Sequence, residues 1–332
     1  MGYRSGSGRF QAKAGLKLRS MSQACVPFSA APEDLRTLMM RIGPIWGQDI
    51  RAHSALVKEA YRPLLAAAPK DGVEVIRDQP YGSNPRQVFD LFLPDAGEGA
   101  TGSGRGRPVV VFVHGGAFVR GDKRTDEHLY DNVAFWFARE GCIGVNLEYR
   151  LAPDAPYPAG ADDLAAAVDW LHRKVARHGG DPGRIFLVGH SAGGTHVASY
   201  ACDPDLGYFG VHVAGIVLIS ARLRADDLPG NPNADGVRAY FGKDAELHAR
   251  RSPVTHCASC KLPVFIVIAE YENPLLDVYG LEMAHGLGQA TGRAPRLLWM
   301  KGHNHMSVVA HFNTGEEYLG REILAFFEST AG

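Results

Sequence analysis

The sequence is short of cysteine, of net charge and of long apolar runs, and each shortage excludes a class of protein. Its 332 residues include only five cysteines, an odd and scattered set, which is typical of a reducing compartment and predicts a cytoplasmic protein. Lys and Arg total 35 against 36 Asp and Glu, so no excess charge attracts nucleic acid or an anionic membrane. No stretch is apolar for long enough to cross a bilayer. The expected partner is therefore a small molecule.

The first 32 residues differ in composition from the rest of the chain. They contain basic residues, glycines and serines but no acidic residue, and they lack the apolar centre of a secretory signal. We expect residues 1–32 to form a basic, disordered extension. An organelle transit peptide would have a similar composition, and Met21 is an alternative start of the native chain.

Two patterns of apolar residues predict the order of helices and strands. Between residues 33 and 68 the apolar side chains recur at helical spacing, with a break at Gly43-Pro44, which predicts two helices. A pair of strands, 73–76 and 88–93, follows, and short apolar runs then alternate with helix-length segments. The runs are 109–113, 143–149, 185–188, 216–219, 264–269 and 297–300, and the segments are 126–140, 161–178, 276–289 and 315–329. This alternation predicts an α/β fold with a mostly parallel sheet and helices on both faces.

The sequence VGHSAGG, residues 188–194, places a serine between a predicted strand and a helix. In a Gly-x-Ser-x-Gly motif the serine occupies a tight, strained turn, and Gly189 and Gly193 allow the two backbones to pass closely. Such a turn holds the hydroxyl out at the N-terminus of the helix. Ser191 is therefore the predicted nucleophile.

The sequence HGGAF, residues 114–118, ends another predicted strand. Attack of a serine on a carbonyl generates an oxyanion, and glycines let backbone N–H groups turn inward to donate to it. Gly115 and Gly116, with the N–H of Ala192 beside the serine, fit this role. The alternative is an ordinary Gly-Gly turn at the end of a strand.

Taken together, these motifs resemble a known family. HGGAF, then YRLAPDAPYPAG at 149–160, then GHSAGG are similar to the hormone-sensitive-lipase-like carboxylesterase branch of the α/β-hydrolase fold, with some likeness to kynurenine formamidases. The likeness runs from residue 73 to the C-terminus and departs from the branch at Ala117, where a third glycine is usual. It implies a catalytic domain over residues 71–332 and cap helices over residues 33–70.

A serine nucleophile needs a histidine base, which a carboxylate must orient. The chain order in this fold is serine, acid, histidine, so the acid should follow the strand at 264–269 and the base should follow the next strand. The family has an acid just before Pro-Leu, which implies Glu272, although Asn273 is inserted there. Asp277 is the alternative acid. The Gly-x-x-His pattern of the family implies His305 as the base.

The other histidines are expected to be structural. His303 stands two residues before His305, and this spacing raises the question of a metal pair. No Asp, Glu or Cys cluster nearby in the sequence completes a coordination shell, so we predict neither a metal nor a cofactor. We expect His303 to shape the loop or face solvent, and His114, His190 and His311 to be structural residues or neighbours of the site.

The substrate is less well defined by the sequence. Segment 222–253 is rich in charge, glycine and proline, and it lacks the large apolar face of a lid that docks on lipid. Soluble esters with short or medium acyl chains are therefore expected. Phe118, Trp46, Tyr61 and Tyr157 are candidates for an aromatic pocket, and the alternative for each is a place in the core.

Three functions stay open at this point. The resemblance implies a serine esterase that works through an acyl-enzyme. An amidase or formamidase would use the same triad, and GDK at 121–123 is faintly similar to formamidases. A non-catalytic ligand-binding receptor is the third, although receptors of this fold lack the histidine that is present here as His305. Whether the chain forms a homodimer is also open.

Overall fold

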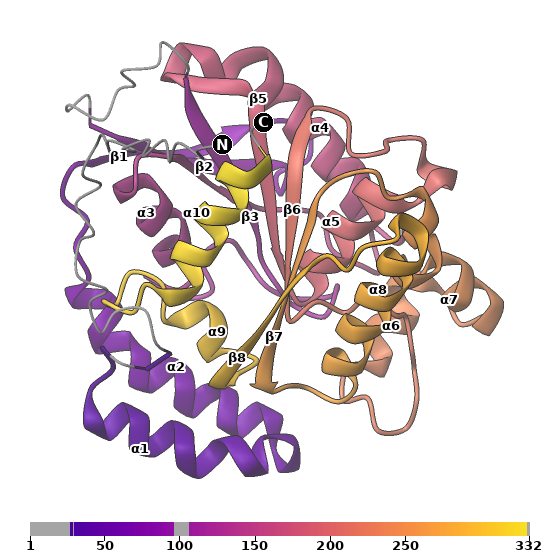
Figure 1. Ribbon diagram of the computed structural model, residues 1–332, viewed down its shortest axis with the longest axis horizontal. Helices are drawn as coiled ribbons and strands as arrows, with labels where there is room; N and C mark the ends of the chain where they lie inside the picture. Colours follow the sequence, from indigo (N-terminus) through magenta and orange to yellow (C-terminus); the bar gives the residue numbers. More distant parts are fainter. Residues whose placement is uncertain (1–26, 29, 96–105, 331–332) are drawn as a thin grey trace, which may run out of the picture.

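The computed structural model describes residues 27–28, 30–95 and 106–330. Its centre is an eight-stranded sheet in the order β1-β2-β4-β3-β5-β6-β7-β8 (Figure 1). The strands are β1 (Val73–Pro80), β2 (Val88–Pro94), β3 (Arg107–Val113), β4 (Ile143–Leu147), β5 (Gly180–His190), β6 (Val213–Ile219), β7 (Val264–Tyr271) and β8 (Arg296–Asn304). β2 pairs with β1 and β4 in antiparallel register, and the remaining pairs are parallel. The prediction of a mostly parallel sheet is confirmed.

Helices cover both faces of the sheet. The side chains of β3 at 109, 111 and 113 face a core shared with α4 (Ala159–Lys174), α5 (Ala192–Cys202) and α8 (Leu276–Thr291). Those at 110 and 112 face a core shared with α3 (Asp131–Arg139), α9 (Ser307–Ala310) and α10 (Tyr318–Thr330). Burial on both faces explains why this strand is apolar at successive positions rather than at alternate ones. No helix in the described part of the chain is long and apolar enough to cross a membrane.

Two helices precede the sheet, as the sequence predicts. α1 (Glu33–Ile42) and α2 (Ile50–Ala67) are joined by the 3-10 helix η2 (Gly43–Gln48), which contains the predicted break. They lie at the ends of β7 and β8 that carry the arrowheads in Figure 1. The carboxyl ends of these strands are where active groups gather in α/β folds. The two helices are thus in a position to cover a site, while the domain boundaries at residues 32 and 70 stay predictions.

Between β6 and β7 the chain makes an excursion that contains α6 (Ala234–Phe241) and α7 (Ala245–Arg251). Val237, Tyr240 and Phe241 of α6 are buried and pack together with Phe118. The excursion therefore has a small apolar face, and this face is turned into the protein.

Most of the predicted N-terminal extension, residues 1–26 and 29, lies outside the described residues. Phe28 is described, and it is half-buried. Its ring stacks on the imidazole of His303, with the ring centroids 4.1 Å apart. This part of the extension packs onto the end of β8.

Candidate active site

Ser191 occupies the turn between β5 and α5. Its backbone has φ 55° and ψ −120°, a conformation that residues with a side chain seldom adopt. A Cβ on Gly189 would lie 2.6 Å from the Cα of Gly194, and a Cβ on Gly193 would lie 2.1 Å from the carbonyl oxygen of Val113. Both glycines of the motif are therefore required by close approach of the backbone. The turn leaves Ser191 partly exposed at the first turn of α5.

Ser191, His305 and Glu272 form a hydrogen-bonded row that joins three loops. His305 Nε2 lies 3.1 Å from Ser191 Oγ, and His305 Nδ1 lies 2.8 Å from Glu272 Oε2. Because an ionised carboxylate only accepts hydrogen bonds, Nδ1 carries the proton and Nε2 faces the serine with its lone pair. Glu272 is held in turn, since its Oε1 accepts a hydrogen bond from the N–H of Ala269 at 3.0 Å. The structure thus brings together the three residues that the sequence nominates, with the tautomer that a general base needs.

The two candidate acids occupy different places. Glu272 contacts His305 directly, whereas Asp277 lies in the first turn of α8. The residue inserted after Glu272 has a structural partner, because Asn273 is buried and its Oδ1 accepts a hydrogen bond from Trp46 Nε1 at 2.9 Å. Trp46 therefore ties η2 to the loop that carries the acid.

Two further histidines support the loops of the row. His190 Nε2 donates to the carbonyl oxygen of His305 at 2.9 Å. Burial and then the neighbouring charge of His305 lower the pKa of His190 well below its ordinary value, so this ring is neutral. His114 Nε2 lies 3.1 Å from Glu148, and the Tyr149 hydroxyl donates to the carbonyl oxygen of His114 at 2.8 Å. Both histidines lie beside the site and hold its backbone, as expected.

The loop after β3 approaches Ser191 through glycine. Gly116 has φ 154°, and a Cβ there would lie 1.7 Å from the carbonyl oxygen of Arg120. This turn is closed by a hydrogen bond of 3.1 Å from the N–H of Arg120 to the carbonyl oxygen of Gly116. Ala192 is the first residue of α5, where a helix leaves N–H groups without an acceptor in the preceding turn. Donors for a developing oxyanion are therefore available near the serine from two elements.

Gly115 is the residue of this loop that lies beside the nucleophile. A Cβ at this position would lie 3.0 Å from Ser191 Cβ. Its role as an oxyanion donor stays a prediction. The residue after Gly116 in this loop is Ala117, which has φ 50°.

The four candidate pocket residues fall into two groups. Phe118 stacks on Tyr240, with the ring centroids 4.8 Å apart, and Tyr157 lies 5.6 Å from Phe241. Both partners come from α6, and the sequence analysis missed them. They stand at helical spacing with Val237 in the segment VRAYF, and this periodicity is a signal that could have revealed them. Phe118 and Tyr157 therefore pack in an aromatic cluster with α6, and their place in a substrate pocket stays a prediction.

Trp46 and Tyr61 belong instead to the core beneath α1 and α2. Both are nearly fully buried, and the Tyr61 hydroxyl has no hydrogen-bond partner within the described part of the chain. His303 is fully buried as well, so it does not face solvent. Its Nε2 lies 2.8 Å from Glu316 Oε1. Burial also lowers the pKa of His311, to about 4, so this ring is neutral at pH 7.

Comparison with known proteins places the chain in a family. A family model described as alpha/beta hydrolase fold matches residues 110–308, which is more than half of the chain. The chain belongs to the alpha/beta hydrolase fold family. The matched region contains Ser191, Glu272 and His305. The predicted fold class is confirmed.

The chain is similar to several known proteins. Esterase LipI of Mycobacterium tuberculosis is 43% identical over 186 residues, which are 51% of this chain and 57% of that protein. Carboxylesterase NlhH of the same organism is 44% identical over 92 residues, 26% of each chain. The chain thus spans about a quarter to a little over half of the length of these relatives. The solved structure of a hyperthermophilic esterase from Pyrobaculum calidifontis superposes with a TM-score of 0.65 at 25% identity, over 90% of this chain and 98% of that chain. These matches confirm the resemblance to the hormone-sensitive-lipase-like branch.

Proposed function

We propose that this protein is a serine hydrolase that cleaves carboxylic esters. The row from Ser191 through His305 to Glu272, with hydrogen bonds of 3.1 and 2.8 Å, is the observation that carries the proposal. Ser191 lies in a strained turn and faces the unprotonated nitrogen of His305. Backbone strain of this kind is concentrated at functional sites. The names of the relatives LipI and NlhH support ester hydrolysis as the reaction.

The proposed reaction proceeds in two halves. Ser191 Oγ attacks the carbonyl carbon of the ester while its proton passes to His305 Nε2, and the electron pair of the carbonyl bond moves to the oxygen. The tetrahedral intermediate collapses, the C–O bond to the alcohol breaks, and His305 Nε2–H protonates the departing oxygen. Water then repeats the same steps on the acyl-enzyme and releases the acid. Glu272 keeps the imidazole in register and stabilises its positive charge in both halves.

The oxyanion needs two or three donors that are in place before the reaction. We assign the N–H groups of Gly115, Gly116 and Ala192 to this role, with Ala117 as the neighbouring donor in the loop. The Ala at position 117 costs the site little, because a backbone donor is independent of the side chain.

The proposed substrates are soluble esters with short or medium acyl chains. The apolar side chains of α6 are buried against Phe118, so the excursion offers no broad apolar face to a lipid surface. Aromatic rings from α6 and Phe118 favour an apolar group of modest size beside Ser191. A cytoplasmic location and a homodimer remain predictions, as does the absence of nucleic-acid and membrane partners.

The first experiment compares p-nitrophenyl butyrate with the matched p-nitroanilide, using purified protein and Ser191→Ala as the blank. We expect turnover of the ester and at least about 100-fold slower turnover of the anilide, because an amine is a poorer leaving group. Comparable turnover of the anilide would replace the esterase proposal with an amidase of the same triad. Failure of both substrates with a folded protein would favour the ligand-binding receptor.

A further inference from the structure

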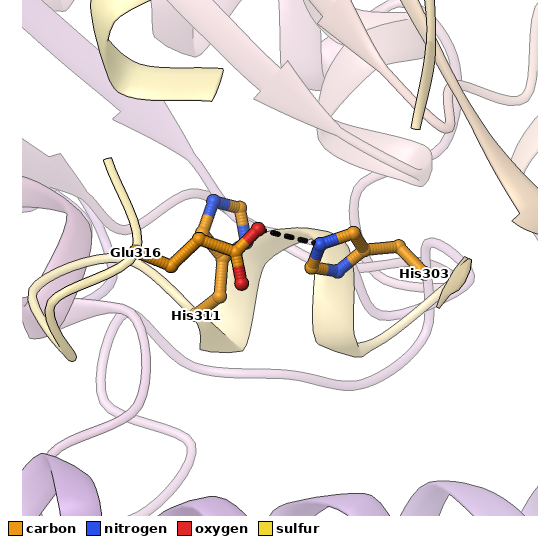
Figure 2. Close-up of side chains that lie close together, drawn as sticks. All are labelled: His303, His311 and Glu316. Atoms are coloured by element: carbon orange, nitrogen blue, oxygen red, sulfur yellow. Dashed lines mark hydrogen bonds and ion pairs between the residues drawn. The ribbon is translucent and has the colours of Figure 1, made fainter. Parts of the chain in front are cut away.

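A second cluster of ionisable side chains lies directly behind the catalytic loop. It consists of His303 at the end of β8, His311 just after α9 and Glu316 shortly before α10, and Figure 2 shows the carboxylate between the two imidazoles. Two of the three residues are fully buried, and Glu316 is 2% exposed. One potential ligand atom from each residue lies within 4.8 Å of the others. The reaction proposed for Ser191 uses none of them.

The hydrogen bonds of this cluster leave two buried acceptor atoms without a donor. His311 Nδ1 lies 3.0 Å from the carbonyl oxygen of Ser307, and because a carbonyl only accepts, Nδ1 carries the proton. With the proton on Nδ1, His311 Nε2 is the atom that can present a lone pair to a ligand. This atom and Glu316 Oε2 are both buried and have no hydrogen-bond partner within the described part of the chain. Two neighbouring acceptors cannot satisfy each other, and burial of an acceptor without a donor is unfavourable.

We propose that His303, His311 and Glu316 bind one divalent transition-metal ion of the zinc type. A cation satisfies both free acceptors at once, and two imidazoles with one carboxylate form a recognised zinc ligand set. The ligand atoms have to close from 4.8 Å to a separation of about 3.3 Å around a four-coordinate ion with bonds of ~2.0 Å, which small side-chain rotations achieve. Binding needs the lone pair of His303 Nε2, so the proton that this atom shares with Glu316 Oε1 moves to Nδ1, which lies 3.2 Å from Ser307 Oγ.

The groups around the cluster fit the same proposal. Histidine ligands usually engage their second ring nitrogen with a carbonyl, carboxylate or water, which sets the tautomer. His311 Nδ1 meets the carbonyl oxygen of Ser307, and His303 Nδ1 lies 3.2 Å from Ser307 Oγ. The second ring nitrogens of both histidines therefore contact Ser307, the first residue of α9. The ion would hold β8 to the start of α10 and would act as a structural element.

His303 and His305 are the histidines whose spacing in the sequence raises the question of a metal pair. The fold points His305 at Ser191 and turns His303 the other way, toward Glu316. The residues that complete the ligand set follow His303 by eight and 13 positions in the sequence. They meet only because α9 and the following turn fold back over the end of β8.

The test measures zinc in untagged protein that is expressed in zinc-supplemented medium and dialysed against metal-free buffer. We expect about one zinc per chain in the wild type and less than about one tenth in Glu316→Gln and His311→Gln. The control is His248→Gln, which removes a buried imidazole from α7 and should retain the metal. Removal of zinc by a chelator should lower the thermal midpoint of the wild type by about 3–5 °C.

Each contrary result is decisive. A wild-type protein that contains less than about 0.1 zinc per chain, with a midpoint unchanged by zinc or chelator, would overturn the proposal and leave a buried water as the bridge between the free acceptors. If the cluster variants do not fold, His305→Asn decides the matter. Loss of zinc from that variant would assign the metal to the triad, whereas retention of zinc, with the absorption of tetrahedral cobalt after substitution, supports the cluster.

Discussion

Two rows of glutamate, histidine and serine lie on opposite sides of one loop in this protein. In the first, His305 joins Glu272 at 2.8 Å to Ser191 at 3.1 Å. In the second, His303 joins Glu316 at 2.8 Å to Ser307 at 3.2 Å. The residue types and distances are nearly the same, so composition alone does not distinguish the two rows.

The rows differ in ring orientation and in access. In the first, Nδ1 meets the carboxylate and Nε2 meets a partly exposed serine on a strained turn. In the second, the ring is reversed, and Ser307 is fully buried and accepts a hydrogen bond from the N–H of Asn304 at 2.9 Å. Phe28 stacks on His303 and closes the second row from the side of the N-terminus. Ser191 is therefore partly open to solvent, whereas the glutamate, histidine and serine of the second row are buried.

The largest expected effect is on kcat, and it distinguishes Ser191 from Ser307. Ser191→Ala should lower kcat for p-nitrophenyl butyrate by about 10⁶-fold, because no other group can form the acyl-enzyme. Ser307→Ala should change kcat by less than about tenfold, because it removes only buried hydrogen bonds worth ~1–2 kcal/mol. Stopped assays with both variants, checked for folding by circular dichroism, measure the difference. Equal losses in the two folded variants would show that the second row also takes part in hydrolysis.

The next effect concerns the acid. Glu272→Gln should lower kcat by about 10⁴-fold, since an amide no longer holds His305 in the required tautomer. Asp277→Asn is the matched control, and it should leave kcat within about threefold of the wild type, as is usual for changes away from the reacting groups. Steady-state kinetics on p-nitrophenyl butyrate decide between them. Abolition of turnover by the Asp277 change alone would refute the proposed triad.

A smaller effect is expected at the oxyanion loop. Gly116→Ala should lower kcat by about 10²-fold with little change in KM, because a Cβ 1.7 Å from the Arg120 carbonyl oxygen must displace a proposed donor. Gly179→Ala is the control, since Gly179 also has a positive φ of 79° but no atom within 4 Å of its added Cβ. Unchanged kcat in a folded Gly116 variant would exclude this loop from the oxyanion hole.

The packing of Phe28 against the second row can be tested through the free energy of unfolding. Phe28→Ala should reduce the free energy of unfolding by about 2 kcal/mol through loss of a half-buried ring, while kcat stays within about twofold. Urea unfolding followed by fluorescence measures the change. A variant as stable as the wild type would mean that Phe28 does not close the second row.

The last expected effect is a pH dependence of the free energy of unfolding, which comes from His196. Burial lowers the pKa of His196, which packs edge-on against Phe118, to about 3. The unfolded chain binds this proton near pH 6.5 and the folded protein does not, so the stability is present above pH 6.5 and is lost as the pH falls toward 3. The slope contributed by this residue is about 1.4 kcal/mol per pH unit. Urea unfolding at pH 7, 6 and 5 should show a shallower slope for His196→Gln, and identical slopes would contradict the assignment.

The parts of the protein that could be predicted from sequence are those with local causes. The order of strands and helices follows from short apolar runs and helical periodicity, which depend on side chains within a few residues of each other. The turn at Ser191 follows from two glycines that lie two residues on either side of it. The alpha/beta hydrolase fold was predictable for this reason, and the family match confirms it.

The parts that could not be predicted depend on contacts between distant segments. The aromatic partners of Phe118 come from α6, more than 100 positions away. In the same way, Trp46 was nominated for the pocket on its residue type, but its place was decided by Asn273.

The sequence by itself determined the architecture, the strained turn at Ser191 and the position of His305 after the last strand, because steric limits and periodicity act over short stretches of chain. Only the tertiary structure decided that Glu272 rather than Asp277 meets His305, and that His303 turns away to join His311 and Glu316. A histidine ring can present either nitrogen to either side of its loop. Which side it takes depends on the charges and acceptors that packing brings to it, and these come from residues that the chain order does not place beside it.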